Sequence, residues 1–187
     1  SRPRRARRIC LRFAGAAFRA HDPRWAHEPL SGAGAAVNRG RFNRKGDPDV
    51  YLALTLEGAI REASKGFAFR IPPLTIVEYE VDCADIVDLR DSGSRRRAGI
   101  GMTDLSAPGA MDLADRREPA SWRVAARLRD EGAAGILVPS FARLAPPGLS
   151  NLILWRWATD GPHRVRLFDP DGRLGPGSEG SPPRGQS

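Results

Sequence analysis

The sequence is poor in the residues that build disulfide frameworks and metal centres. Its 187 residues include two cysteines, Cys10 and Cys83, and three histidines. The cysteines form no closely spaced pair, which argues against a disulfide framework and a cysteine-ligated metal. The histidines, His21, His27 and His163, are scattered along the chain, which argues against a zinc cluster. We therefore expect no metal cofactor.

Long apolar runs are also missing. No stretch approaches the roughly 18 to 20 apolar residues that a membrane helix needs. The basic N-terminal segment, residues 1–13, lacks the apolar core and the cleavage site of a signal peptide. We therefore expect a cytoplasmic protein with no membrane association. The length and the hydrophobic content of 41% predict one domain with a substantial core.

Acidic residues are in the minority, with 22 against 30 basic residues and a formal net charge of +8. Such a balance is compatible with nucleic-acid binding. However, Lys45 and Lys65 are the only lysines, and the arginines are spread along the chain, many of them beside Asp or Glu. Aromatic residues do not alternate with them as base-stacking platforms require. We therefore favour a solvated surface with a site for an anionic ligand; a basic face suits an acidic protein partner equally well.

The hydrophobic pattern predicts a mixed α+β domain in which strands outnumber helices. A helix is expected from the N-cap Thr55 to about Phe67, and a second from the N-cap Ser121 to a stop at Gly132. Residues 91–119 are expected to be loop-like or weakly helical, with a flexible part around 92–101. The order of the strands cannot be derived from the pattern. Strands are predicted at residues 17–21, 37–43, 50–54, 74–81, 86–89, 135–140, 151–155 and 165–168.

Composition divides the chain into three parts. Residues 1–8 are expected to be a disordered basic arm, and residues 9–169 to be the folded domain. Residues 170–187 are rich in Gly, Pro and Ser and are expected to form a loose tail, because they carry too little apolar surface to order themselves.

No familiar catalytic motif is present: the sequence has no GxSxG elbow, Walker loop, HExxH or GxGxxG. The remaining candidates are single polar residues. Arg19 lies in an apolar strand candidate, and Arg41 follows Gly40, which allows close approach of a ligand. The fixed fork of an arginine matches two phosphate oxygens. On pattern alone a solvated strand residue is the commoner role for Arg19, whereas for Arg41 the two roles are about equal.

Three further candidates have equally ordinary structural roles. Tyr51 offers a ring face and a hydroxyl, although a core tyrosine with a wet tip is commoner. Glu62 lies on a helix edge with small neighbours, although it also suits a surface pair with Lys65 or Arg61. Ser140 ends an apolar strand, where functional sites collect, although turn serines are commoner. From these residues alone the prediction is an α+β domain with an anionic-ligand site.

In their order along the chain these segments resemble the RES domain, a family named for its Arg, Glu and Ser residues. The resemblance is carried by FRAH around Arg19, by residues 40–62, by ILVPSFAR around Ser140 and by NLILWRW from Asn151. It covers roughly residues 10–169. Arg39 departs from it, because the resemblance predicts a second glycine before GRFN, and the basic loop around residues 94–97 is longer than the family minimum.

The resemblance implies a toxin of a bacterial toxin–antitoxin pair. The implied fold is ADP-ribosyltransferase-like: a split, mostly antiparallel sheet with flanking helices around an NAD+ cleft. The implied partner is a Xre-like antitoxin that covers this cleft. Some members of the family degrade NAD+ by phosphorolysis or hydrolysis, and others transfer ADP-ribose to a protein, including phosphoribosyl-pyrophosphate synthetase.

The resemblance also implies roles for the candidates. Glu62 would stabilise the positive charge that develops on the ribose when nicotinamide leaves. Arg19 and Arg41 would hold the pyrophosphate, and Tyr51 would stack on the nicotinamide end. Ser140 would hydrogen-bond within the ribose–nicotinamide pocket. The weaker candidates are Asn43, also expected to contact NAD+, His21 and Asn151.

Three functions stay open. The first is ADP-ribose transfer to a protein, slightly favoured because the basic loop would help to dock a macromolecule. The second is an NAD+ phosphorylase or glycohydrolase that depletes NAD+. The third, from another class, is a non-catalytic basic binding module. The substitution Glu62→Gln separates the enzymes from the third, because a pure binder does not depend on this carboxylate.

Overall fold

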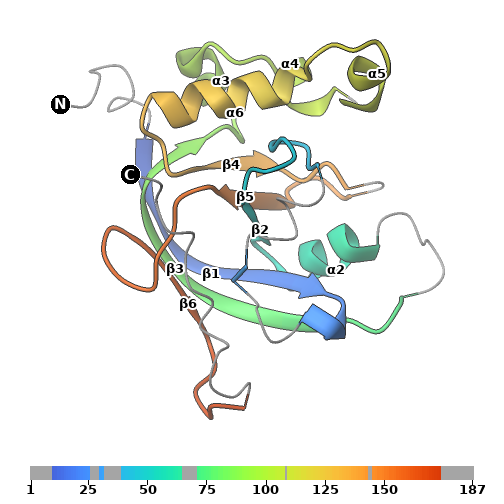
Figure 1. Ribbon diagram of the computed structural model, residues 1–187. Coiled ribbons are helices and arrows are strands. Elements are labelled where there is room, and N and C mark those ends of the chain that lie inside the picture. The colour runs from blue at the N-terminus through green and yellow to red at the C-terminus, as the bar shows by residue number, and fades with distance from the viewer. Residues whose placement is uncertain are drawn as a thin grey trace.

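The computed structural model describes residues 10–25, 30–31, 39–64, 71–107, 109–142 and 145–173. Six strands, five α-helices and one 3-10 turn form within these ranges (Figure 1). In chain order they are β1 Cys10–His21, η2 Pro23–Trp25, β2 Val50–Ala53, α2 Leu56–Ser64, β3 Thr75–Asp88, α3 Ser92–Ala98, α4 Met102–Ser106, α5 Gly109–Ala114, α6 Ala120–Asp130, β4 Gly135–Pro139, β5 Ser150–Leu154 and β6 His163–Leu167.

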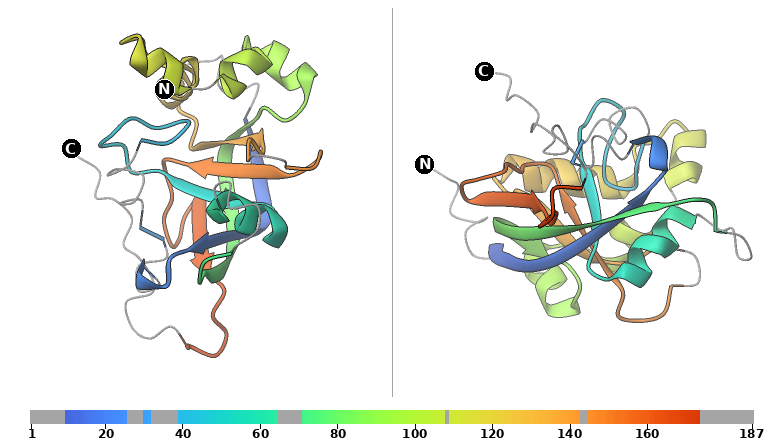
Figure 2. Two further views of the ribbon diagram at one scale, coloured as in Figure 1. Left: turned by 90° about the vertical axis from the view of Figure 1, so that its right-hand side faces the viewer. Right: turned by 90° about the horizontal axis from the view of Figure 1, so that it is seen from below.

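The six strands form one sheet that closes on itself. Their order is β1-β2-β5-β4-β3-β6, and β1 pairs in addition with β3. Figures 1 and 2 show β1 and β3 as two long curved strands that run side by side. All pairings are antiparallel except the short parallel ladder between β3 and β4. The predicted α+β class and the mostly antiparallel sheet are therefore confirmed.

Two hydrophobic clusters lie on the two faces of the central strands. Leu137 of β4 and Leu152 of β5 belong to the cluster inside the curved sheet, which also contains Tyr79. Their strand neighbours Ile136 and Ile153 belong to the second cluster, which the helices of residues 92–130 cover. Successive side chains of a strand point to opposite faces of the sheet, so β4 and β5 each contribute side chains to both clusters. Figure 1 shows α3 to α6 on the β4 side of the sheet and α2 apart from them, beside β1 and β2.

Apart from the strand predicted at residues 37–43, the strand predictions are confirmed in place but differ in extent. Strand β1 begins at Cys10 rather than at residue 17, because it pairs with β3 along its length. The separate strands predicted at 74–81 and 86–89 are one strand, β3, which continues through Asp85 at a positive φ of 61°. Residues 39–43 form no strand, so that part of the prediction at 37–43 is wrong. Residues 37 and 38 lie outside the described residues.

Residues 91–119 are expected to be loop-like or weakly helical, and the helical alternative is confirmed, because three short helices, α3 to α5, form in this segment. The segment expected to be flexible contains α3, which has caps at both ends. The Asp91 side chain accepts a hydrogen bond from the Ser94 amide at 2.9 Å, and Gly99 closes the helix in the left-handed region with φ 65°. The local capping hydrogen bonds therefore stabilise a helix that the hydrophobic pattern does not predict.

The two predicted helices are present, and only the second starts at a different residue. Thr55 caps α2 as predicted, since its Oγ1 accepts from the Gly58 amide at 3.0 Å. The predicted end near Phe67 lies outside the described residues. Helix α6 has Pro119 at its N-cap, and Ser121 lies inside the helix, so the predicted serine cap is wrong. Gly132, with φ 93°, follows the end of α6 as predicted.

The predicted arm over residues 1–8, residues 174–187 of the predicted tail and His27 lie outside the described residues. None of the described helices has the length and apolar character needed to span a bilayer.

Candidate active site

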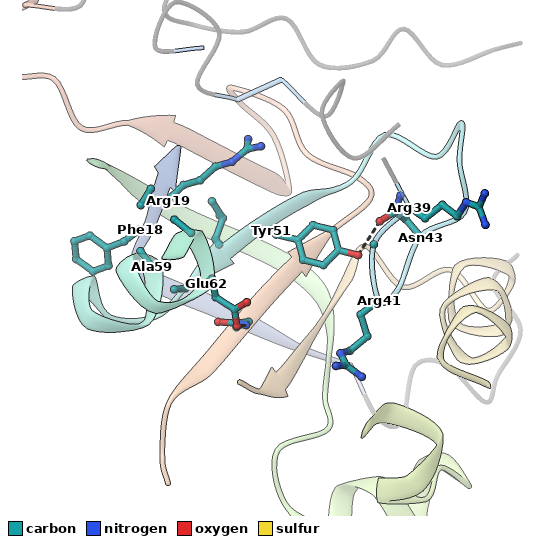
Figure 3. Close-up of a pocket in the computed structure, with 14 residues that line it drawn as sticks. Phe18, Arg19, Arg39, Arg41, Asn43, Tyr51, Ala59 and Glu62 are labelled. Carbon is teal, nitrogen blue, oxygen red and sulfur yellow. Dashed lines mark hydrogen bonds between the residues drawn. The ribbon is translucent and has the colours of Figure 1, made fainter. Parts of the chain in front are cut away.

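A cavity of about 470 Å³ lies between β1, β2, α2 and the loop of residues 39–43 (Figure 3). Its volume falls in the range of roughly 300 to 1,000 Å³ that is typical of small-molecule sites. Two of the predicted residues, Ser140 and His21, are not part of its lining. The lining is made by Phe18, Arg19, Ala20, Arg39, Gly40, Arg41, Asn43, Tyr51, Leu52, Ala53, Ala59, Glu62, Ala63 and Asn151.

Among the described residues of this lining, Glu62 provides the only carboxylate. Its Oε1 accepts two hydrogen bonds, from Ser140 Oγ at 2.9 Å and from Asn151 Nδ2 at 2.6 Å. Ser140 Oγ in turn accepts from the Ala142 amide at 3.2 Å. Two donors on one oxygen fix the orientation of a carboxylate. Ser140 therefore contacts the predicted catalytic group, and its predicted contact with substrate stays a prediction.

Sheet pairing explains how these residues meet. Strand β4 pairs with β5, with Val138 opposite Asn151 and Pro139 opposite Ser150. Ser140 follows the end of β4, so its side chain reaches the same carboxylate as Asn151. The Oδ1 atom of Asn151 is buried and has no hydrogen-bond partner within the described residues. Asn151, a weaker candidate from the sequence, is thus a direct partner of Glu62.

Tyr51 and Asn43 line the cavity on the side formed by the loop of residues 39–43. The Tyr51 hydroxyl donates to Asn43 Oδ1 at 2.9 Å (Figure 3). It also accepts from the Phe42 amide at 3.0 Å. Burial raises the pKa of Tyr51, so the hydroxyl stays protonated at neutral pH. A Cβ on Gly40 would lie 2.2 Å from Asn43 Oδ1 and 2.5 Å from the Tyr51 hydroxyl. Glycine at this position therefore allows the loop to close on Tyr51.

Arg41 points from this loop toward α4 (Figure 3). Its Nη1 donates to the carbonyls of Leu105, Ser106 and Ala107 at 3.1 to 3.3 Å. Its guanidinium lies 4.6 Å from the centre of the Phe141 ring, a cation–π contact that the sequence analysis missed. Burial lowers the pKa of Arg41 and the nearby Glu62 charge opposes this effect. The Arg41 side chain thus connects the loop of residues 39–43 to α4. Its predicted contact with a phosphate stays a prediction.

Arg19 lies on β1 opposite Val77. Figure 3 shows Arg19 and Arg41 on different sides of the cavity. Nη1 of Arg19 donates to the Ser31 carbonyl at 3.2 Å. Burial lowers the pKa of Arg19, although a guanidinium remains charged at any physiological pH. A desolvated cation in the wall favours an anionic group in the cavity.

His21 ends β1, two residues after Arg19. Its Nε2 is buried without a hydrogen-bond partner within the described ranges. Burial, and secondarily the Arg19 charge, lowers its pKa, so the ring is neutral at physiological pH. Its predicted supporting role stays a prediction.

Helix α6 holds the loop in place through contacts that the sequence did not indicate. Trp122 Nε1 donates to the Gly40 carbonyl at 2.9 Å, and Ser121 Oγ donates to the Arg41 carbonyl at 2.5 Å. Asp49, with no exposed surface, accepts two bonds from Nη2 of Arg129, at 2.8 and 2.7 Å.

Within the described residues no group of three or more His, Cys, Asp and Glu side chains is placed to hold a metal ion.

Comparisons with known proteins give one family and one fold. The family profile of the RES domain matches residues 16–175. The chain is similar to a solved structure described as the M. tuberculosis MbcT-MbcA toxin-antitoxin complex, with 19% sequence identity and a TM-score of 0.56 over 88% of this chain and 89% of that chain. No curated protein matches the sequence. With 160 consecutive residues matched by the family profile, the chain belongs to the RES domain family.

Proposed function

We propose that this protein is the toxin of a toxin–antitoxin pair that cleaves NAD+ and transfers ADP-ribose to a bacterial protein. One observation carries the proposal. The described residues of the cavity lining include one carboxylate, Glu62, and three arginines, and Ser140 and Asn151 both donate to Glu62 Oε1. This arrangement suits a substrate that has phosphates and develops positive charge during the reaction.

The chemistry follows from the carboxylate. Breaking the bond between the ribose C1′ and the nicotinamide nitrogen sends the electron pair to the ring, which leaves as neutral nicotinamide. Positive charge then develops on C1′ and the ring oxygen of the ribose. A fixed carboxylate stabilises this charge without any reorganisation during the step. A nucleophile on the acceptor forms the new bond to C1′ and loses its proton.

In this proposal the remaining residues contact different parts of the substrate. Arg19 and Arg41 supply positive charge for the pyrophosphate, and Asn43 and Tyr51 form the nicotinamide side. The contacts of Arg41 with α4 carbonyls leave its charge uncompensated by a carboxylate at hydrogen-bond distance within the described residues. The proposed fold is accordingly ADP-ribosyltransferase-like, with this cavity as the inner part of the NAD+ cleft.

The proposed partner is a Xre-like antitoxin that covers the cavity. The fold supports this part of the proposal, because the similar M. tuberculosis structure is of a toxin–antitoxin complex. We expect the toxin to act in the cytoplasm, where NAD+ and a protein acceptor are available. Phosphoribosyl-pyrophosphate synthetase is the candidate acceptor.

The test uses purified protein, free of antitoxin, with NAD+ labelled on its adenylate. One tube contains bacterial lysate and another contains phosphate. A discrete labelled protein band, absent with Glu62→Gln, supports transfer and delivers the acceptor. Rapid loss of NAD+ with only small-molecule products would show that the enzyme acts by phosphorolysis or hydrolysis and not by transfer to a protein. Folded protein with no turnover in either tube contradicts an NAD+-consuming activity and favours a binding module.

A further inference from the structure

The three arginines of the cavity lining differ in what they contact. Arg19 donates to the Ser31 carbonyl, and Arg41 donates to three carbonyls beside α4 and stacks on Phe141. Arg39 borders the same cavity, but its side chain is exposed and makes no hydrogen bond or ion pair with any described residue. It is the arginine of this lining whose five donors are available to a ligand.

The backbone beside Arg39 is fixed although its side chain is not. The Gly40 amide donates to the Asn43 carbonyl at 3.3 Å, and the Gly40 carbonyl accepts from Trp122 Nε1 at 2.9 Å. Arg39 is therefore attached to a fixed position on the rim. Figure 3 shows its side chain extending outward from the loop, away from Glu62. A ligand that projects from the cavity passes this rim.

The charge of the lining is unbalanced. Its described residues include three arginines and one carboxylate, and two hydrogen-bond donors already bind that carboxylate. A phosphate is the anion whose oxygens match the fork of a guanidinium. The sequence adds a second argument, because the resemblance to the RES domain predicts glycine rather than arginine at position 39. Contact through this side chain is thus a property of this chain.

We propose that Arg39 is a phosphate-binding residue at the mouth of the cavity. The inference rests on the proposed function, since it takes a nicotinamide dinucleotide as the ligand. The phosphate has two possible sources. One is the diphosphate that NAD+ and NADP+ share, and the other is the 2′-phosphate that only NADP+ carries.

The test measures kcat and KM for NAD+ and NADP+ in four proteins: wild type, Arg39→Gln, Arg39→Lys and Arg166→Gln. Arg166, on β6, is exposed and outside the cavity lining, and its replacement removes the same charge. Loss of one charge-assisted contact should raise KM about tenfold in Arg39→Gln, with kcat changed less than about twofold. Arg39→Lys should recover part of this loss, and Arg166→Gln should behave as wild type.

The two substrates identify the phosphate. An equal rise in KM for NAD+ and NADP+ assigns Arg39 to the diphosphate, whereas a larger rise for NADP+ assigns it to the 2′-phosphate. Turnover by Arg39→Gln with the KM values of wild type for both substrates overturns the inference and leaves the proposed function standing.

Calorimetric titration with ADP-ribose and with ADP-ribose 2′-phosphate tests the contact without turnover. Should wild-type protein consume neither dinucleotide, the proposed function fails and the titration still decides the inference. Binding of at least one of the two ligands about tenfold weaker in Arg39→Gln than in Arg166→Gln supports the phosphate site. Equal affinities of the two variants for both ligands, or no binding of either ligand by wild type, overturn it.

Discussion

The two sides of the cavity are held by different kinds of contact. On the α2 side, Glu62 is bound by two other side chains, those of Ser140, directly after β4, and of Asn151 on β5. On the loop side, Arg41 donates to backbone carbonyls, and the Tyr51 hydroxyl accepts from a backbone amide. The first side orients a reactive group, whereas the second joins the loop to the helices. Substitutions of Glu62 and its two donors should therefore change turnover, and those that remove the contacts fixing the loop should change stability.

The largest effect is expected from Glu62→Gln. Loss of the carboxylate charge should lower kcat at least about 1,000-fold, equivalent to about 4 kcal/mol, because the developing positive charge loses its stabilisation. Glu57→Gln is the matched control, since Glu57 lies on the same helix but is exposed and pairs with Arg61. NAD+ consumption and thermal unfolding are measured for both. Full turnover by Glu62→Gln would exclude this carboxylate from the chemistry.

The next effect is a pH dependence of stability on the loop side. Burial raises the pKa of Asp49 from 3.8 to about 6, against the opposing effect of Arg129. The folded protein therefore takes up this proton at a higher pH than the unfolded chain does. The resulting stabilisation is fully present below about pH 4 and is lost as pH rises through about 6, by up to about 3 kcal/mol.

Urea unfolding of wild type and Asp49→Asn between pH 4 and 7 measures this difference. The variant leaves Arg129 without its carboxylate and should be less stable at every pH, but it should lack the Asp49 component of the slope. Asp47→Asn, on the same loop, controls for a general change of charge. Identical slopes in wild type and Asp49→Asn would show that Asp49 does not titrate in this range.

A smaller effect is expected from the donors to Glu62. Ser140→Ala and Asn151→Ala should each lower kcat about 10- to 30-fold, roughly 1.4 to 2 kcal/mol, because each removes one donor that orients Oε1. Ser150→Ala, which replaces a serine on the adjoining strand, is the control and should keep wild-type turnover. A rise in KM with unchanged kcat in the two test variants would show that they bind substrate rather than orient Glu62.

The smallest effect is expected from Tyr51→Phe. This change keeps the ring but leaves the Phe42 amide without its partner, which should cost about 1 to 2 kcal/mol of stability. A double-mutant cycle with Asn43→Ala isolates the hydrogen bond between the two side chains. A coupling energy near zero would mean that the pair does not hold the loop.

Some residues of the site could be found from the sequence and others could not. Glu62, Tyr51 and Arg41 were found through the resemblance, because their own patterns fitted ordinary structural roles as well. Phe141 and Ser121 were missed as site residues. Phe141 follows Ser140 directly, which was the one available signal, whereas nothing in the spacing of α6 indicates that Ser121 binds the loop.

The sequence by itself determined the local elements, because hydrophobic alternation and the Thr55 cap depend on residues a few positions apart. Only the tertiary structure decided that β1 closes on β3 and that Ser140 reaches Glu62, 78 positions away in the chain. It also turned Arg41 toward α4. The physical reason is that almost any residue can supply the backbone groups of a strand pairing or a carbonyl acceptor. The residue types in the sequence therefore do not indicate which distant segments will be partners.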